Sequence, residues 1–154
     1  MRTNQKIYHR LDYTPYPYRL PSTSLEFNLA HERTEVTLEV SFEALTKEPQ
    51  AMVLDGENIT LIEIRLDGET LSPQAYQVDA EKLIIFQPPV KGCLRIVTVI
   101  HPSKNTSLLG LFSAEDDLLT QCEAEGFRRI TYFADRPDVL SVYSVKLRGC
   151  SRLA

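Results

Sequence analysis

The chain has 154 residues, of which 43% are hydrophobic and 25% are charged. These proportions are typical of a soluble globular protein, and the length suits one domain or one domain with an appendage. A formal net charge of −4 leaves no basic excess to neutralise phosphate groups, so the composition argues against a nucleic-acid partner.

The cysteine content and the first residues bear on location. Cys93, Cys122 and Cys150 are an odd number of thiols that lie far apart, and no C-x-x-C pair occurs. The N-terminal stretch MRTNQKIYHRLDYTPYPYRLP is polar and offers no apolar run for a secretory leader or a membrane span. Reduced thiols are the default in the cytosol, so we predict a cytoplasmic protein without membrane association.

Residues 1–21 are rich in tyrosine and proline. Proline fixes φ and removes an amide donor, which disfavours a helix. We expect an extended arm that lies over a surface, in which each tyrosine buries its ring and keeps its hydroxyl in water. A partly ordered tail is the alternative.

From Ser22 the hydrophobic residues recur with a period of two. In SLEFNL (24–29) every second residue is apolar, and TEVTLEVSFEAL (34–45) alternates in the same way. Such alternation is typical of half-buried antiparallel strands. The short polar link AHERT (30–34) predicts that the two strands form a hairpin.

Further strands are expected along the chain, with Asp-Gly turns between some of them. The strands fall near residues 51–54, 59–66, 75–79, 82–87 and 91–100. Asp55-Gly56 and Asp67-Gly68 are turn signals, because glycine accepts a positive φ.

These patterns divide the chain into an arm at 1–21, a β-sandwich at 22–147 and a tail at 148–154. At least seven short strands, together with the absence of any sustained period of 3.6, indicate an all-β fold. The predicted architecture is therefore an antiparallel β-sandwich preceded by an extended arm.

The histidine content excludes several metal and hydrolase motifs. The three histidines are His9, His31 and His101, and they form no His-x-x-x-His pair. HERTE (31–35) begins like the zinc motif H-E-x-x-H, but it ends in Glu35 and lies between strands. We predict no metal ligand, no cofactor and no catalytic residue in this chain.

A nucleophilic Cys122 paired with His101 is formally possible. A thiol becomes reactive when an electropositive environment lowers its pKa. Cys122 is instead followed by Glu123, whose charge would raise the pKa of the thiol. The residue is better interpreted as a small buried hydrophobe, and a hydrolase that uses Cys122 is one of three hypotheses.

The segment TQCEAEGFRRITYFADRPDVL (120–140) is dense in polar and aromatic residues. A strand over 118–123 would place Leu119, Gln121 and Glu123 on one face. A carboxylate beside an amide oxygen suits an ammonium group. An exposed strand face is the alternative, and the other charged residues could form a structural ion network. Those residues are Glu125, Arg128, Arg129, Asp135, Arg136 and Asp138.

The same segment, preceded by NTSLLGLF at 105–112, closely resembles a signature of the bacterial aminopeptidase N family of zinc-dependent gluzincin aminopeptidases. The opening of the chain from Tyr8 and VLDGENITL at 53–61 are also similar to that family, so the resemblance extends to about Val145. It implies a saddle-like N-terminal β domain that precedes a thermolysin-like catalytic domain.

The resemblance also implies roles for two residues. In the family, the Gln and Glu of T-Q-C-E hold the free α-amino group of the substrate, and they correspond to Gln121 and Glu123. The G-A-M-E-N and H-E-x-x-H segments are not in this chain, so zinc and the catalytic domain would belong to a parent enzyme. The end of the chain, LRGCSRLA (147–154), departs from the expected pattern, as an excised or prematurely ended domain would.

Two main hypotheses follow. The first is a substrate-anchoring domain, or truncated form, of a zinc aminopeptidase that removes N-terminal residues from peptides and is inactive alone. The second is a stand-alone β-sandwich that binds a protein partner without catalysis. An apolar face left uncovered by the catalytic domain would favour the first.

Overall fold

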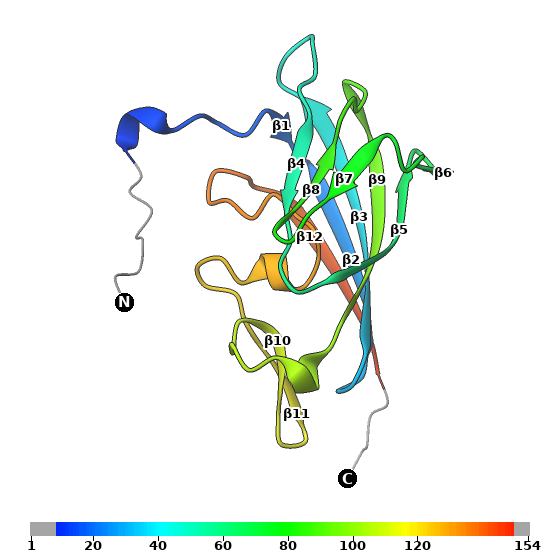
Figure 1. Cartoon of the computed structure of the whole chain (residues 1–154), viewed down its shortest axis with the longest axis vertical. Coiled ribbons are helices and arrows are strands. Elements are labelled where there is room, and N and C mark those ends of the chain that lie inside the picture. Colours follow the sequence, from blue (N-terminus) through cyan, green and yellow to red (C-terminus); the bar gives the residue numbers. More distant parts are fainter. Residues whose placement is uncertain (1–8, 150–154) are drawn as a thin grey trace.

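The computed structural model describes residues 9–149 (Figure 1). The first eight residues of the predicted arm and residues 150–154 of the predicted tail lie outside this range, whereas Arg148 and Gly149 of that tail belong to the last strand. Within the range, the only helices are three short 3-10 turns, and none has the length and apolarity needed to cross a lipid bilayer. The all-β prediction is confirmed.

Within residues 9–149, twelve strands form three sheets. They are β1 (Tyr18–Arg19), β2 (Ser22–Leu29), β3 (Thr34–Ala44), β4 (Met52–Asp55), β5 (Thr60–Leu66), β6 (Glu69–Thr70), β7 (Tyr76–Val78), β8 (Lys82–Ile85), β9 (Lys91–Ile100), β10 (Gly110–Ala114), β11 (Asp117–Gln121) and β12 (Val142–Gly149). The 3-10 turns are η1 (Arg10–Asp12), η2 (Pro102–Lys104) and η3 (Phe127–Arg129).

The main sheet has the strand order β12-β2-β3-β9-β5-β6, and β1 pairs with the end of β3. The predicted hairpin of β2 and β3 is confirmed, with Thr23 opposite Val40 and Asn28 opposite Glu35. All pairs in this sheet are antiparallel except β12 with β2, which run parallel from Val142 opposite Ser22. The last described strand, β12, is therefore an edge strand and lies beside β2, one of the first strands of the chain.

The smaller sheet, β4-β8-β7, faces the main sheet (Figure 1). Alternating residues of both sheets point inward and form one buried cluster, as expected for a sandwich. The largest fully buried side chains include Leu38, Met52, Leu54, Leu83, Leu94 and Ile96. The packed core thus lies between the two sheets.

The β10–β11 hairpin lies at one end of the sandwich (Figure 1). From it the chain passes through η3 and an irregular segment to β12. This segment is joined to β4, where Asp55 N donates to Phe133 O at 2.7 Å and Phe133 N donates to Asp55 O at 3.0 Å. The segment is therefore fixed to the core.

The two Asp-Gly pairs use glycine for different reasons. Gly68 has φ +86° in the turn between β5 and β6, as predicted. Gly56 does not have a positive φ. The prediction that this glycine serves a turn by accepting a positive φ is therefore wrong. A Cβ at Gly56 would lie 2.3 Å from the ring of Tyr132, so the glycine is needed for close packing.

The described part of the predicted arm has two environments. Tyr16, Tyr18 and Leu20 are buried in the core, and the hydroxyl of Tyr16 donates to Val53 O at 3.0 Å. Further toward the N-terminus, η1 extends away from the sandwich, and Leu11 is 97% exposed (Figure 1). The last tyrosines of the arm thus belong to the core.

Candidate functional site

The two residues expected to bind an ammonium group lie side by side, but only one is in a strand. β11 ends at Gln121, and Glu123 lies in the turn that follows. The expected strand over 118–123, with a face shared by both residues, is therefore wrong. The turn still brings them together, because Gln121 Nε2 donates to Glu123 O at 3.5 Å. Both side chains are exposed.

A close approach at Gly126 shapes this turn. Gly126 N donates to Cys122 O at 2.9 Å. A Cβ on Gly126 would lie 2.6 Å from Gln121 O and 2.7 Å from the Cα of Cys122, so only glycine fits. Sequence reasoning missed this role, because a glycine required for space leaves no pattern in the sequence.

The partner strand supplies a second glycine. Gly110 stands opposite Gln121 in the hairpin and has φ +78°. A Cβ there would lie 2.8 Å from the Cβ of Arg129, so η3 packs directly against the hairpin. Gly110 and Gly126 together fix the end of β11 from two sides.

A partly buried ion pair between Arg128 and Asp135 lies next to this turn. Arg128 Nε donates to Asp135 Oδ2 at 3.0 Å, and the two side chains are 16% and 12% exposed. Burial lowers the pKa of Arg128, but its hydrogen bond to Asp135 and the neighbouring acids outweigh that effect and raise it. Arg128 also reaches Glu125 in the turn, at 3.4 Å. The structural ion network weighed as an alternative is therefore present beside the candidate pair.

Asp138 joins the arm to the same segment. Its carboxylate accepts hydrogen bonds from Arg136 Nε at 2.8 Å, the Tyr13 hydroxyl at 3.0 Å and Tyr16 N at 3.3 Å. Arg136 Nη2 also donates to Thr14 O at 2.7 Å. The bond from Arg136 is the main reason why the pKa of Asp138 falls to about 2. Asp138 and Arg136 thus tether the arm.

The structure does not bring Cys122 and His101 together. His101 Nδ1 donates to Glu32 O at 2.7 Å. Cys122 is half-buried against the core, and burial together with the charge of Asp135 raises the pKa of its thiol. Both observations favour the interpretation of Cys122 as a small hydrophobe.

The residues of HERTE do not converge on a metal site. His31 Nδ1 lies 2.9 Å from Ser113 Oγ, which joins the β2–β3 turn to β10. In the part of the chain that the structure describes, no group of three His, Cys, Asp or Glu side chains could hold a metal ion. These residues therefore do not fit a zinc ion.

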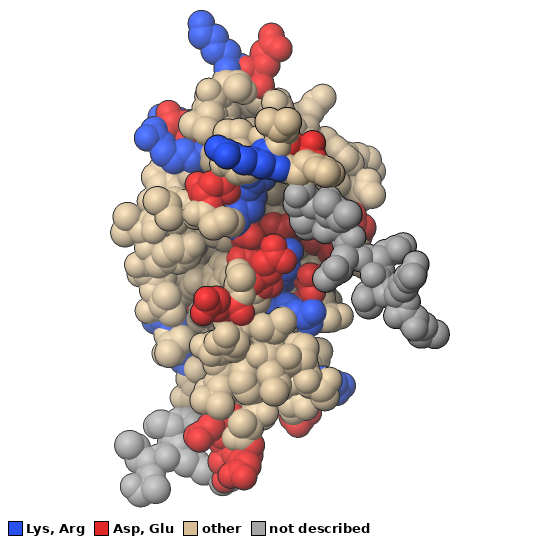
Figure 2. Space-filling model, turned by 90° about the vertical axis from the view of Figure 1, so that its left-hand side faces the viewer, with Lys and Arg blue, Asp and Glu red and all other residues tan. Residues whose placement is uncertain are grey.

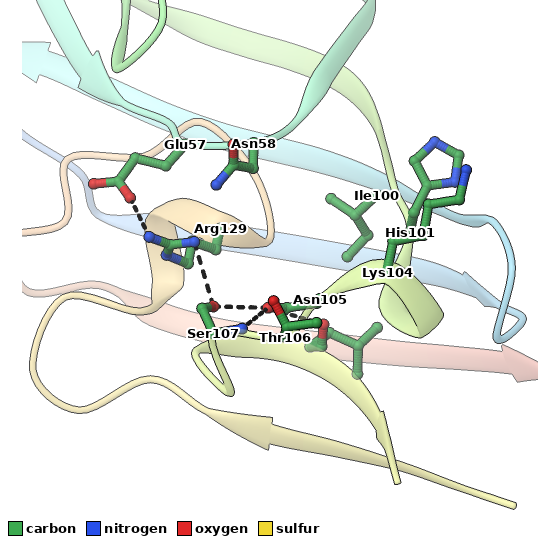
Figure 3. Close-up of a pocket in the computed structure, with 10 residues that line it drawn as sticks. Glu57, Asn58, Ile100, His101, Lys104, Asn105, Thr106, Ser107 and Arg129 are labelled. Carbon is green, nitrogen blue, oxygen red and sulfur yellow. Dashed lines mark hydrogen bonds and ion pairs between the residues drawn. The ribbon is translucent and has the colours of Figure 1, made fainter. Parts of the chain in front are cut away.

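A pocket of about 350 Å³ lies between the β10–β11 hairpin and the sandwich (Figure 3). The Glu57–Arg129 ion pair, at 2.7 Å, closes one side, and Arg129 Nη1 donates to Ser107 Oγ at 3.3 Å. Asn105 Nδ2 donates to the carbonyls of Leu109 and Leu111. These polar groups are occupied by one another, and neither candidate residue lines the pocket.

The face that carries the arm, η3 and the hairpin has acidic side chains gathered at its middle, with basic side chains around them (Figure 2). A further acidic group lies at the hairpin end of this face (Figure 2).

Known proteins resemble both the sequence and the fold. The chain is 45% identical to aminopeptidase N of Caulobacter vibrioides over 138 residues, which are 90% of the chain and 16% of that protein. It is 35% identical to aminopeptidase N of Escherichia coli over 139 residues, again 90% of the chain and 16% of the relative. The chain thus spans about one-sixth of the length of these relatives. No protein-family profile matches it.

Solved structures of related proteins have the same fold as this chain. The aminopeptidase A of Legionella pneumophila, solved in complex with aspartic acid, superposes with a TM-score of 0.82 and 27% identity over 89% of the chain and 16% of that protein. An M1 zinc metallopeptidase of Deinococcus radiodurans shares the fold, with a TM-score of 0.71 and 16% identity over 86% of the chain and 33% of that protein. Sequence and fold together relate this chain to the N-terminal β domain of the aminopeptidase N family.

Proposed function

We propose that the chain is the substrate-anchoring N-terminal domain of a zinc aminopeptidase, which removes N-terminal residues from peptides. The observation that carries this proposal is the exposed pair Gln121 and Glu123. The carboxylate of Glu123 takes part in none of the ion pairs found within residues 9–149, although several neighbouring charged residues do. The Glu123 carboxylate and Oε1 of Gln121 therefore remain available to a ligand.

The pair has the chemistry to bind a free α-amino group. A protonated amine has hydrogen-bond donors and no acceptor, so it needs oxygen atoms around it. The carboxylate of Glu123 supplies two oxygens and the charge. Gln121 donates through Nε2 to the Glu123 carbonyl, which leaves its Oε1 as a further acceptor.

The remaining chemistry would come from outside this chain. In such an enzyme zinc activates a water molecule and polarises the peptide carbonyl. The described residues do not fit that ion, so we assign no step of hydrolysis to them. Their proposed task is to bind and orient the N-terminus of the peptide.

The isolated chain is proposed to bind peptides too weakly for function. An exposed carboxylate–ammonium contact contributes about 0–1 kcal/mol, whereas a millimolar complex requires about 4 kcal/mol. The anchor would become effective when a catalytic domain covers it and excludes water.

The cellular location is part of the proposal. Cys93 and Cys122 are both free thiols, which is typical of reducing compartments. We therefore propose that the protein works in the cytoplasm on peptide N-termini.

The test uses aminopeptidase N of C. vibrioides in which the matching stretch is replaced by this chain. Glu123→Gln should lower kcat/KM for an amino-acid amide about 10- to 100-fold, because a charged hydrogen bond to the ammonium is lost. Glu125→Gln is the control, since Glu125 lies in the same turn but its side chain is 72% exposed and contacts Arg128. Equal losses in the two variants, or none in Glu123→Gln, would contradict the anchor.

A further inference from the structure

The inner face of β12 is apolar and uncovered. Tyr143, Val145 and Leu147 point toward the core side of the main sheet, yet they are 48%, 56% and 65% exposed. Their partners on β2 are Thr23, Leu25 and Phe27. Those partners are buried, so one side of the same sheet is covered at β2 and open at β12.

The outer face of β12 has the opposite character. Lys146 and Arg148 form ion pairs with Glu26 of β2, at 3.5 and 2.7 Å. Charged pairs of this kind suit a face that remains in water. The strand is thus apolar toward the core side and polar toward solvent, which is the pattern of a strand covered on its inner face.

The uncovered face continues the existing core. The ring of Tyr143 lies 6.4 Å from that of Phe127, edge to face, and 6.1 Å from that of Phe133. Both phenylalanines belong to the segment that follows the candidate anchor. β12 is also the end strand of the main sheet, so one of its edges has no partner strand within residues 9–149 (Figure 1).

We propose that Tyr143, Val145 and Leu147 form the docking surface for the polypeptide that follows this chain in a longer aminopeptidase. This inference rests on the proposed function. β12 is the last described element, and the chain accounts for only 16% of the length of its relatives. The occupant is apolar, because the three side chains carry no charge, and its docking would place it next to Phe127, in the segment that follows the candidate anchor.

Two variants, one double and one single, separate the faces of β12. Val145→Thr with Leu147→Thr changes the inner face, and Val142→Thr changes the outer face, where Val142 is 75% exposed. Each substitution introduces threonine, a β-branched residue with high strand propensity. In the isolated chain these residues are exposed, so the melting temperature should change little in both variants.

In the C. vibrioides enzyme that carries this chain, the two variants should differ. The inner-face variant should shorten the half-life of activity at raised temperature by about fivefold or more, because a buried contact is weakened. The outer-face variant should leave it unchanged. Equal half-lives would overturn the docking surface, whatever the effect of Glu123→Gln, so the two proposals fail independently.

Hydrogen exchange gives a second readout without substitution. The amides of β12 should exchange more slowly in the longer enzyme than in the isolated chain, since docking protects the strand. Equal exchange would overturn the proposal. So would an isolated chain whose dimer is lost in the inner-face variant while the longer enzyme is unaffected, because the occupant would then be a second copy.

Discussion

Arg128 holds Asp135 through three donors: its backbone N and its Nε donate to Asp135 Oδ2, and its Nη2 donates to Asp135 O. The side chains of this pair are less exposed than those of any other ion pair within residues 9–149. The pair closes the loop between η3 and the segment that is joined to β4. It therefore fixes the base of the turn that carries Glu123.

Removal of Arg128 should destabilise the fold. Arg128→Met leaves the carboxylate of Asp135 without its partner, which for a buried pair costs about 3 kcal/mol. Arg19→Met is the control, because the Arg19–Glu43 pair has side chains 65% and 47% exposed and should contribute less than about 1 kcal/mol. Urea unfolding measures both. Similar losses in the two variants would argue against a structural role specific to Arg128.

The Asp138 tether should make stability depend on acid pH. The pKa of Asp138 falls from its ordinary 3.8 to about 2 in the folded chain, chiefly because Arg136 donates to it. A lowered pKa means that the stabilisation is complete above about pH 4 and is lost as the pH falls toward 2. With allowance for solvent screening it amounts to about 1 kcal/mol.

Asp138→Asn isolates this effect. The free energy of unfolding should differ between the variant and the parent chain at pH 6, and the difference should shrink as the pH falls through the range from 4 to 2. Other carboxyl groups titrate in both proteins and cancel in the comparison. A difference that stays constant with pH would refute the tether as a charged interaction.

Thr131 offers a stabilising substitution. The residue is fully buried, and its Oγ1 has no hydrogen-bond partner among the described residues. Thr131→Val removes an unsatisfied hydroxyl at nearly equal volume, so it should be neutral or stabilise by about 1 kcal/mol. Thr34→Val is the matched control. Thr34 is equally buried, but its Oγ1 donates to Ala30 O at 2.7 Å, so the change should destabilise by about 1–2 kcal/mol.

Gly126→Ala should displace the turn that carries the candidate anchor. The new Cβ would meet backbone atoms of Gln121 and Cys122, which cannot move aside as a flexible side chain can. Gly68→Ala is the control, because it strains a residue at φ +86° with open space around it. Both should lose about 1–2 kcal/mol of stability. Only Gly126→Ala should shift the backbone NMR signals of Gln121 and Glu123; unchanged signals there would show that the turn tolerates a side chain.

Local patterns predicted the strands that pair with sequence neighbours. Alternation identified β2 and β3 and the short polar link between them. β10 was not predicted, because the turn that joins it to β11 uses Glu115 at φ +54° instead of glycine. β12 was not predicted, because its partner β2 lies at the other end of the chain and a parallel pairing leaves no nearby turn signal.

The sequence predicted which residues form the candidate site but not the backbone conformation that carries them. The resemblance marked Gln121 and Glu123, and the structure places them next to each other. The alternation rule failed at Glu123, because β11 stops at Gln121. The turn that follows is shaped by the close approach of Gly126 to Gln121 and Cys122 and by the Arg128–Asp135 pair. Such contacts arise from packing in three dimensions and have no periodic signature.

The parallel pairing of β12 with β2 has a consequence for synthesis of the chain. β2 is synthesised before β3, whereas its outer partner β12 follows all the other described strands along the chain and leaves the ribosome after them. Until then β2 pairs only with β3. The backbone groups along the other edge of β2 are open to pairing with other nascent chains. Closing so long a loop is slow, so the main sheet should complete its folding after translation of β12 instead of strand by strand.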